Sequence, residues 1–336
     1  MSRARRTALA VVVVTLVLAA LAIRVGPGDV SWADVVGAIG RGLVGQQRLA
    51  DVDDAQVWAL RVPRVMLVIL VGAALAGGGA VTQGLFRNPL ADPSVLGISL
   101  GAAFVAVLGL LLGLDRAGIW VTPVLAAIGA AATLAILLAL ATRSSDATTL
   151  LLAGVALGAT CGAATTCVLA LAGDRHDLGI RVVRWLMGSF EGRSWGHLLG
   201  ASIPIGLGLL LSGTLVRDLD ALALGDDVAA SLGASPARVQ RRAVTAVALL
   251  VGGATAVAGV LGFLGLVVPH VVRWRLGGGH RALVPISALG GAAVLLAVDT
   301  VTRLGATALP PGVITSLLGA PAFLWILLAQ ARRREE

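Results

Sequence analysis

A serine and two histidines in this sequence could together carry out bond chemistry. Ser189 follows Gly188, while His197 and His270 lie in apolar stretches. A serine beside a histidine at one depth could serve as the nucleophile and base of an intramembrane serine protease. However, Gly188-Ser189-Phe190 lacks the second glycine that would open the backbone around such a nucleophile. The protease is therefore an alternative, which a serine-reactive probe would test.

Lysine is missing from the sequence, so all 26 basic residues are arginines. A Walker A phosphate loop requires a lysine. The chain therefore cannot be a standard P-loop ATPase, and any ATP it uses must be hydrolysed by another polypeptide. The arginines lie in short segments between apolar runs, so the net charge of +8 does not indicate nucleic-acid binding.

The two cysteines, Cys161 and Cys167, lie in one apolar segment. Their spacing places them on different faces of a helix, which disfavours both a disulfide and a metal site. We expect them to be small packing residues, and we expect no metal site in the chain.

The composition predicts an integral membrane protein made of helices. Hydrophobic residues make up 57% of the chain, charged residues only 13%, and the mean hydropathy is +0.94. A bilayer-spanning helix needs a run of about 20 apolar residues. Ten such spans can be placed, at roughly 7–23, 63–86, 94–113, 119–141, 148–172, 196–215, 240–259, 262–276, 282–303 and 312–330.

An even number of spans puts both termini on one side. Placing them in the cytoplasm leaves most arginines inside, in agreement with the positive-inside rule. The loop 216–240 is then cytoplasmic, and 24–64 and 173–195 are external. We expect residues 1–336 to form a single all-α transmembrane domain. Small residues around Gly72 and Gly252 match in order, which predicts an inverted internal repeat.

Four strings of sequence point to a known family. They are RVPRVMLVILVGAALAGGGAVTQGLFRNPLADPSVLGISLG from Arg61, WLMGSF from Trp185, GFLGLVVPHVVR from Gly262 and PPGVITSLLGAPAFLWILL from Pro310. Together they resemble the permease subunits of iron-siderophore and vitamin B12 importers, the BtuC-like (FecCD) family. The resemblance implies a packing role for His270, and a ten-helix subunit of an ABC importer that catalyses no bond chemistry itself.

The resemblance also assigns roles to three arginines at the external ends of spans. Arg61, Arg64 and Arg303 match family arginines that receive acidic residues of a substrate-binding protein. From the residues alone, arginines that reach toward lipid head groups would explain the same positions.

The cytoplasmic loop carries a short amphipathic segment, LALGDDVAASLG, which resembles the family's coupling helix for the ATPase. We expect Asp226 to cap this helix and Gly233 to end it. The residues implied in coupling are Leu222, Leu224, Gly225, Asp226, Ala229, Leu232 and Gly233.

Two segments match the ends of the family's translocation pathway. The cytoplasmic narrowing corresponds to Asp146, Thr148 and Thr149, although such residues also begin ordinary helices. The outer end corresponds to Trp185, Met187, Ser189 and Phe190, whose aromatic rings would also suit a membrane interface.

The sequence therefore predicts an importer permease in the inner membrane of a bacterium, most consistent with iron-siderophore transport. Cobalamin and haem are alternative substrates, and an ion-driven secondary transporter is an alternative of another class. The implied partners are a second permease copy or a homologous subunit, two ATPase subunits that hold ATP and Mg²⁺, a binding protein and membrane lipid. No cofactor is expected in this chain, and no nucleic acid.

Overall fold

The computed structural model describes residues 3–26, 28, 30–45, 51–118, 120–141, 147–171, 176–304 and 309–335. These residues form helices and no strand. The α-helices are α1 (Arg3–Arg24), α2 (Trp32–Leu43), α3 (Val52–Asp54), α4 (Val62–Leu85), α5 (Ile98–Leu111), α6 (Val121–Ala141), α7 (Ala147–Leu171), α8 (His176–Leu186), α9 (Trp195–Leu222), α10 (Asp226–Ser231), α11 (Pro236–Ala258), α12 (Leu264–Leu276), α13 (His280–Thr302) and α14 (Pro311–Glu335). Three short turns have other helical geometry: η1 (Ala55–Arg61), η2 (Pro93–Leu96) and η3 (Leu114–Ala117).

Each of the ten predicted spans coincides with a helix. Among the described residues, seven helical segments are long and apolar enough to cross a membrane: α1, η1 with α4, α6, α7, α9, α11 and α13. Two shorter apolar segments, Ile98–Leu111 and Pro311–Trp325, occupy the third and tenth predicted positions. The short eighth span corresponds to the 13-residue α12.

Two boundary differences lie on either side of α10. Helix α9 continues to Leu222 and α11 begins at Pro236, although their predicted apolar spans ended near 215 and began near 240. A helix satisfies its own backbone hydrogen bonds, so it can run beyond its apolar part into water. The loop between the two helices is consequently shorter than predicted.

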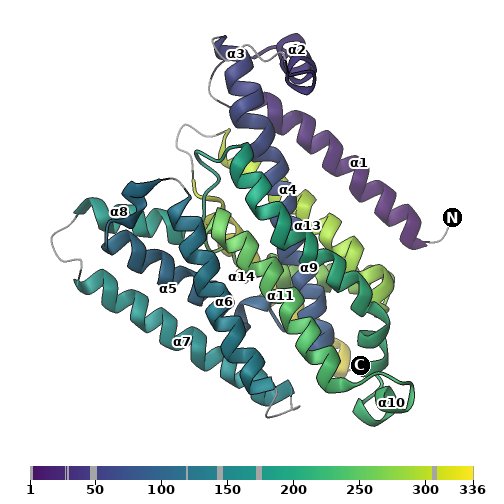
Figure 1. The fold of residues 1–336 in the computed structure, drawn as a ribbon. Coiled ribbons are helices and arrows are strands. Elements are labelled where there is room, and N and C mark those ends of the chain that lie inside the picture. Colours follow the sequence, from purple (N-terminus) through teal and green to yellow (C-terminus); the bar gives the residue numbers. More distant parts are fainter. Residues whose placement is uncertain are drawn as a thin grey trace.

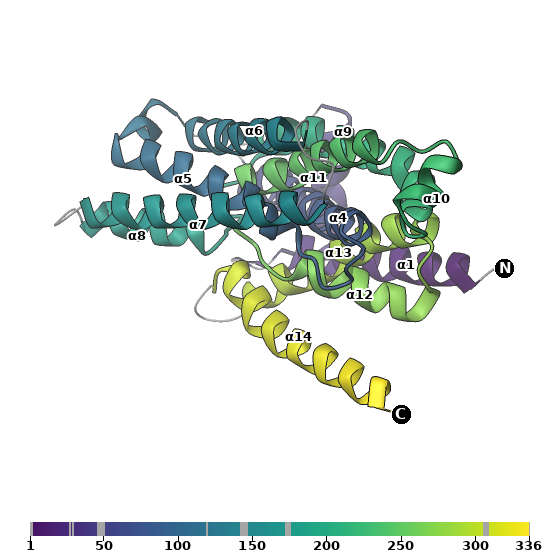
Figure 2. The same cartoon turned by 90° about the horizontal axis from the view of Figure 1, so that it is seen from below.

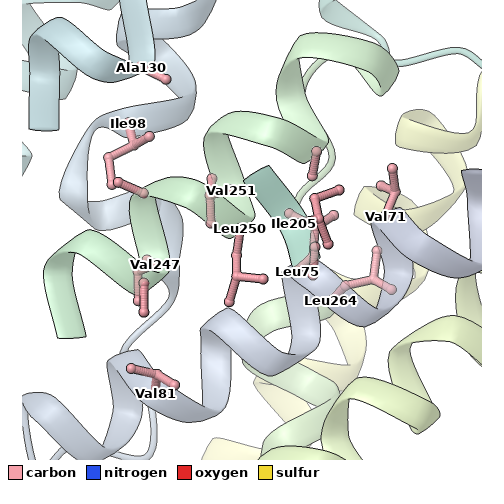
Figure 3. Packing of buried hydrophobic residues seen from close by; sticks show 14 of the residues in the cluster. Val71, Leu75, Val81, Ile98, Ala130, Ile205, Val247, Leu250, Val251 and Leu264 are labelled. Carbon is pink, nitrogen blue, oxygen red and sulfur yellow. The ribbon is translucent and has the colours of Figure 1, made fainter. Parts of the chain in front are cut away.

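Helix α4 occupies the centre of the bundle. In the segment Ala55–Leu85, which η1 and α4 form, 78% of an apolar 18-residue stretch is buried. Helix α4 packs against α13, α11, α9 and α12. Figure 3 shows Val71 and Leu75 of α4 close to Ile205 of α9, with Leu250 of α11 beside them. Helix α1 lies at the edge of the bundle, where only 11% of its apolar 18-residue stretch is buried. Such an apolar, uncovered helix is what a lipid-facing position requires.

Close contact between α4 and α13 depends on two glycines. A Cβ built on Gly72 would collide with the carbonyl oxygen of Gly291, and a Cβ on Gly291 would collide with that of Gly72. In the matched repeat, a Cβ built on Gly252 of α11 would collide with the Cβ of Ala130 on α6. Small residues at such crossings let helix backbones approach closely.

We predict that Gly72→Val destabilises the protein by about 1–3 kcal/mol, the usual cost of overpacking. Neither backbone can move away without opening the α4–α13 contact. Gly213→Val in α9 is the matched control, because nothing lies within 4 Å of its added Cβ. Thermal unfolding in detergent should separate the two variants; equal melting temperatures would show that the crossing tolerates the extra volume.

The two ends of the bundle differ in what they carry. Figure 1 shows α2 and α3 together beyond the C-terminal end of α1, and α10 at the opposite end. Both described chain ends lie on the α10 side, and Figure 2 shows α14 leaning away from the other helices. We refer to these as the α2 end and the α10 end.

Candidate functional site

At the α2 end, two of the three predicted docking arginines bind the end of α1. The Arg61 guanidinium donates to the carbonyl oxygens of Ile23 (3.1 Å) and Arg24 (2.6 Å). Arg303 donates to those of Ala22 (2.9 Å) and Val25 (2.8 Å). The last carbonyls of a helix lack partners within it and carry partial negative charge. These arginines therefore cap α1, a role that the sequence analysis did not foresee.

A buried carboxylate joins the other side of this cluster. Asp299 is 0% exposed and lies 2.8 Å from Arg64 Nη2 and 3.1 Å from Arg303 Nη2. The carboxylate therefore neutralises part of the charge that the arginines bring. Arg64 is held in place but retains some exposure (18% of its side chain).

The same arginines line a pocket of about 330 Å³ that opens at the α2 end. Its lining is Val25, Gly26, Gln56, Leu60, Arg61, Arg64, Phe190, Glu191, Gly192, Arg193 and Arg303. The pocket lining carries four guanidiniums and one carboxylate, that of Glu191. Asp299 adds a second carboxylate against Arg64 and Arg303. The region therefore keeps an excess of positive charge. Such a pocket suits an acidic side chain of a partner.

Arg193 is a pocket arginine that the sequence reasoning missed. Its Nε is buried without a hydrogen-bond partner among the described residues, and burial lowers the pKa of its guanidinium. An incoming carboxylate would supply the missing acceptor. Its neighbours Gly192 and Glu191 follow the WLMGSF string, which is the signal that could have drawn attention to it.

The predicted outer pathway segment lies beside this pocket. Trp185 lies in the last turn of α8, and Met187 is exposed. Phe190 is buried and lines the pocket. The Ser189 amide donates to Ala258 O (2.9 Å). Glycines hold the segment closely: Gly259 contacts the carbonyl of Trp185, and Gly312 that of Met187. The segment is therefore fixed between α11 and α14.

At the α10 end, the predicted coupling residues divide into two groups. Leu222 and Ala229 are buried in the chain's own core, so they attach α10 to the bundle. Leu224 and Leu232 are exposed, as is Val228, which the sequence reasoning missed. Only Val228 lies within α10, because Leu224 precedes the N-cap and Leu232 is the C-cap, so the helical period did not identify the set. The three residues form the apolar surface available to a partner.

The ends of α10 also differ from the expectation. Asp226 is the first helical residue, not the cap; Gly225 occupies the N-cap with φ 113°. The Asp226 carboxylate instead pairs with Arg87, which follows α4. Gly233 follows the helix with φ 86°, as predicted for its end.

A second contact joins α9 to α13 near α10. The backbone amide of His280 donates to Asp220 Oδ1 (2.8 Å), and the His280 ring nitrogen Nδ1 lies 2.7 Å from the same oxygen. The His280 ring packs against Gly84 near the end of α4. The contacts of His280 therefore join α4, α9 and α13, and the Asp226–Arg87 pair links α10 to the segment after α4.

The remaining predicted residues give no catalytic arrangement. Thr148 and Thr149 are exposed in the first turn of α7, and Asp146 lies outside the described residues. Ser189 Oγ accepts from the Glu191 amide (3.1 Å), whereas His197 Nδ1 lies 3.1 Å from Ser194. Among the described residues, no group of three or more His, Cys, Asp or Glu could hold a metal ion.

Comparison with known proteins gives consistent matches. The model of the FecCD transport family matches residues 13–329. The hemin transport system permease HmuU of Yersinia pestis is 41% identical over 285 residues, covering 83% of this chain and 85% of the relative. The vitamin B12 import permease BtuC of Vibrio cholerae is 44% identical over 279 residues, covering 81% and 82%.

A solved structure also matches the fold. It is described as an inward-facing conformation of a metal-chelate type ABC transporter. The match has a TM-score of 0.84 and 27% identity, and it covers 97% of this chain and 99% of the other.

Proposed function

This chain belongs to the FecCD transport family, and from that premise we propose that it carries a ferric siderophore across the bacterial inner membrane. As a family member it is a multi-pass permease subunit of an ABC importer for substrates of the B12, haem and siderophore type. It works as a dimer, and a separate ATPase subunit hydrolyses ATP. The absence of lysine agrees with this division of labour.

The observation that supports binding-protein-dependent import is the arginine-lined pocket at the α2 end. We place this end outside the cell and the α10 end, with both termini, in the cytoplasm. Acidic residues of a binding protein would enter the pocket and meet Arg64 and Arg193. Charge pairs of this kind increase association rates and fix the orientation of the partner.

We predict that Arg193→Glu weakens binding of the cognate binding protein about tenfold, or about 1.4 kcal/mol. Arg61 and Arg303 bind carbonyls of α1, whereas Arg193 has no hydrogen bond to α1 among the described residues, so the fold should survive. Binding to the purified permease should be measured at two salt concentrations, because screening weakens such pairs. Arg184→Glu on exposed α8 is the control; equal affinities for both variants would remove Arg193 from the docking site.

The choice of a siderophore rests on coordination chemistry. Haem iron takes axial ligands such as His, Met, Cys or Tyr. The chain has no tyrosine, four histidines and three methionines, and its described residues contain no ligating cluster. A siderophore already fills the coordination sphere of its iron and needs no such ligand. The residue supply therefore suits a saturated chelate over haem, which leaves a ferric siderophore and cobalamin to be separated by uptake measurements.

Uptake of labelled substrates by the native host, with and without this gene, tests the proposal. We expect deletion to abolish uptake of a ferric siderophore and to leave cobalamin and haem uptake unchanged. Loss of cobalamin or haem uptake alone would keep the importer and replace the substrate. Unchanged uptake of all three would contradict the assignment to this group of substrates.

A further inference from the structure

Helix α2 exposes an apolar face that the function described above does not use. Its exposed residues are Trp32, Ala33, Val36, Gly40 and Leu43, followed by Val44 at the C-cap. At 100° per residue they fall within one third of the helix circumference. No charged residue interrupts this stripe, and Val36 and Leu43 are 70% and 75% exposed.

The other faces of α2 are already occupied. Val35 and Ala38 pack with Val57 and Val62 in a separate small core, and Gly42 lies against the Trp58 ring. The charged residues are also engaged: Arg41 Nε donates to Asp54 (2.8 Å). A capping box between Ser31 and Asp34 fixes the N-terminus of the helix, and the Ser31 hydroxyl lowers the pKa of Asp34. The helix is therefore rigidly oriented, with its apolar stripe facing outward.

The position of α2 along the membrane normal follows from α1. Helix α1 has 22 residues, a length of about 33 Å, which matches a hydrocarbon core of about 30 Å. Its C-terminal Arg24 therefore lies at the membrane interface. Only residues 25–31 separate α1 from α2, so α2 begins at the same level. Figure 1 shows α2 nearly end-on beyond the end of α1, so that α2 lies across the direction of the spans.

A contact between the two helices marks the same level. The Arg24 guanidinium lies 5.6 Å from the centroid of the Trp32 ring. Tryptophan and arginine are both typical of the head-group region. Helix α1 also exposes Leu16, Val17 and Leu21, an apolar surface that suits contact with lipid.

We propose that α2 is an interfacial anchor whose apolar stripe inserts into the outer leaflet of the bilayer at the head-group boundary. An amphipathic helix that lies in the membrane plane buries its apolar side in this way. The charge-driven docking inferred for the binding protein does not suit the stripe, which offers no charge. Lipid contact would hold α3 and η1, and with them Arg61, at a fixed height beside the pocket.

Nitroxide accessibility in the full-length protein tests this proposal. The protein is placed in nanodiscs of phosphatidylethanolamine and phosphatidylglycerol, in a Cys161→Ala, Cys167→Ala background. Labels at Val36→Cys and Leu43→Cys are compared with a lipid reference at Val14→Cys on α1 and a water reference at Asp227→Cys on α10. Oxygen reports lipid exposure, and a water-soluble nickel chelate reports aqueous exposure.

We expect the ratio of oxygen to nickel collisions at Val36 and Leu43 to approach that of Val14 and to exceed that of Asp227 several-fold. A ratio equal to that of Asp227 would place the stripe in water and overturn the proposal. Low accessibility to both reagents would also overturn it, because a protein partner would then cover the stripe.

Discussion

Asp299→Ala is expected to destabilise the permease more than any other single substitution of a charged residue at the α2 end. The carboxylate is fully buried between Arg64 and Arg303. Its removal leaves two poorly exposed guanidiniums facing each other without a counter-charge. Breaking a buried ion pair on one side typically costs about 3–5 kcal/mol. Because Arg303 also caps α1, the loss should loosen the contact between α1 and α13.

Thermal unfolding of the purified protein in detergent measures this effect. We expect the melting temperature to fall by about 5–10 °C. Asp226→Ala is the matched control, since its pair with Arg87 is exposed, and exposed pairs contribute about 0–1 kcal/mol. A melting temperature for Asp299→Ala equal to that of the control would show that the buried carboxylate does not hold the cluster together.

The second large effect is expected at α10. Val228→Asp with Leu232→Asp should reduce ATP-driven uptake about 100-fold while the protein remains folded in the membrane. Both side chains are exposed, so the substitutions leave the core intact. Burying a leucine or valine contributes about 1.5–3 kcal/mol, and a carboxylate placed in an apolar cleft adds a desolvation cost. A combined loss of about 3 kcal/mol would lower the affinity for the ATPase about 100-fold.

Co-purification of the ATPase and uptake should be measured on the same membranes. Asp227→Asn changes the charge of α10 but keeps its apolar surface, so it should retain both activities. Binding of the substrate-binding protein should not change in either variant. Full uptake by the double variant would contradict the coupling role of Val228 and Leu232.

The hydropathy pattern predicted where the chain crosses the membrane because lipid imposes one simple requirement on every span. Helices α2 and α8 were not predicted, since each is short and lies between predicted spans, in the segments 24–64 and 173–195. The spacing of Ser31 and Asp34 was the available signal for α2, because it is typical of a helix start.

The site was harder to predict than the fold. The resemblance named Arg61, Arg64 and Arg303 as one set, and they line one pocket; their role in docking stays a prediction. The resemblance did not reveal that Arg61 and Arg303 bind carbonyls of α1, because the contact joins residues distant in sequence and depends on how α1 packs. Similarly, periodicity alone could not tell that Leu222 and Ala229 face inward while Val228 faces outward.

Import through this chain should be driven by ATP. The test is uptake of a ⁵⁵Fe-labelled siderophore into proteoliposomes that contain the permease with its ATPase, with the binding protein outside and ATP inside. We predict uptake that requires internal ATP and stops with vanadate. Uptake that continues without ATP and follows an ion gradient would contradict the account and identify a secondary transporter.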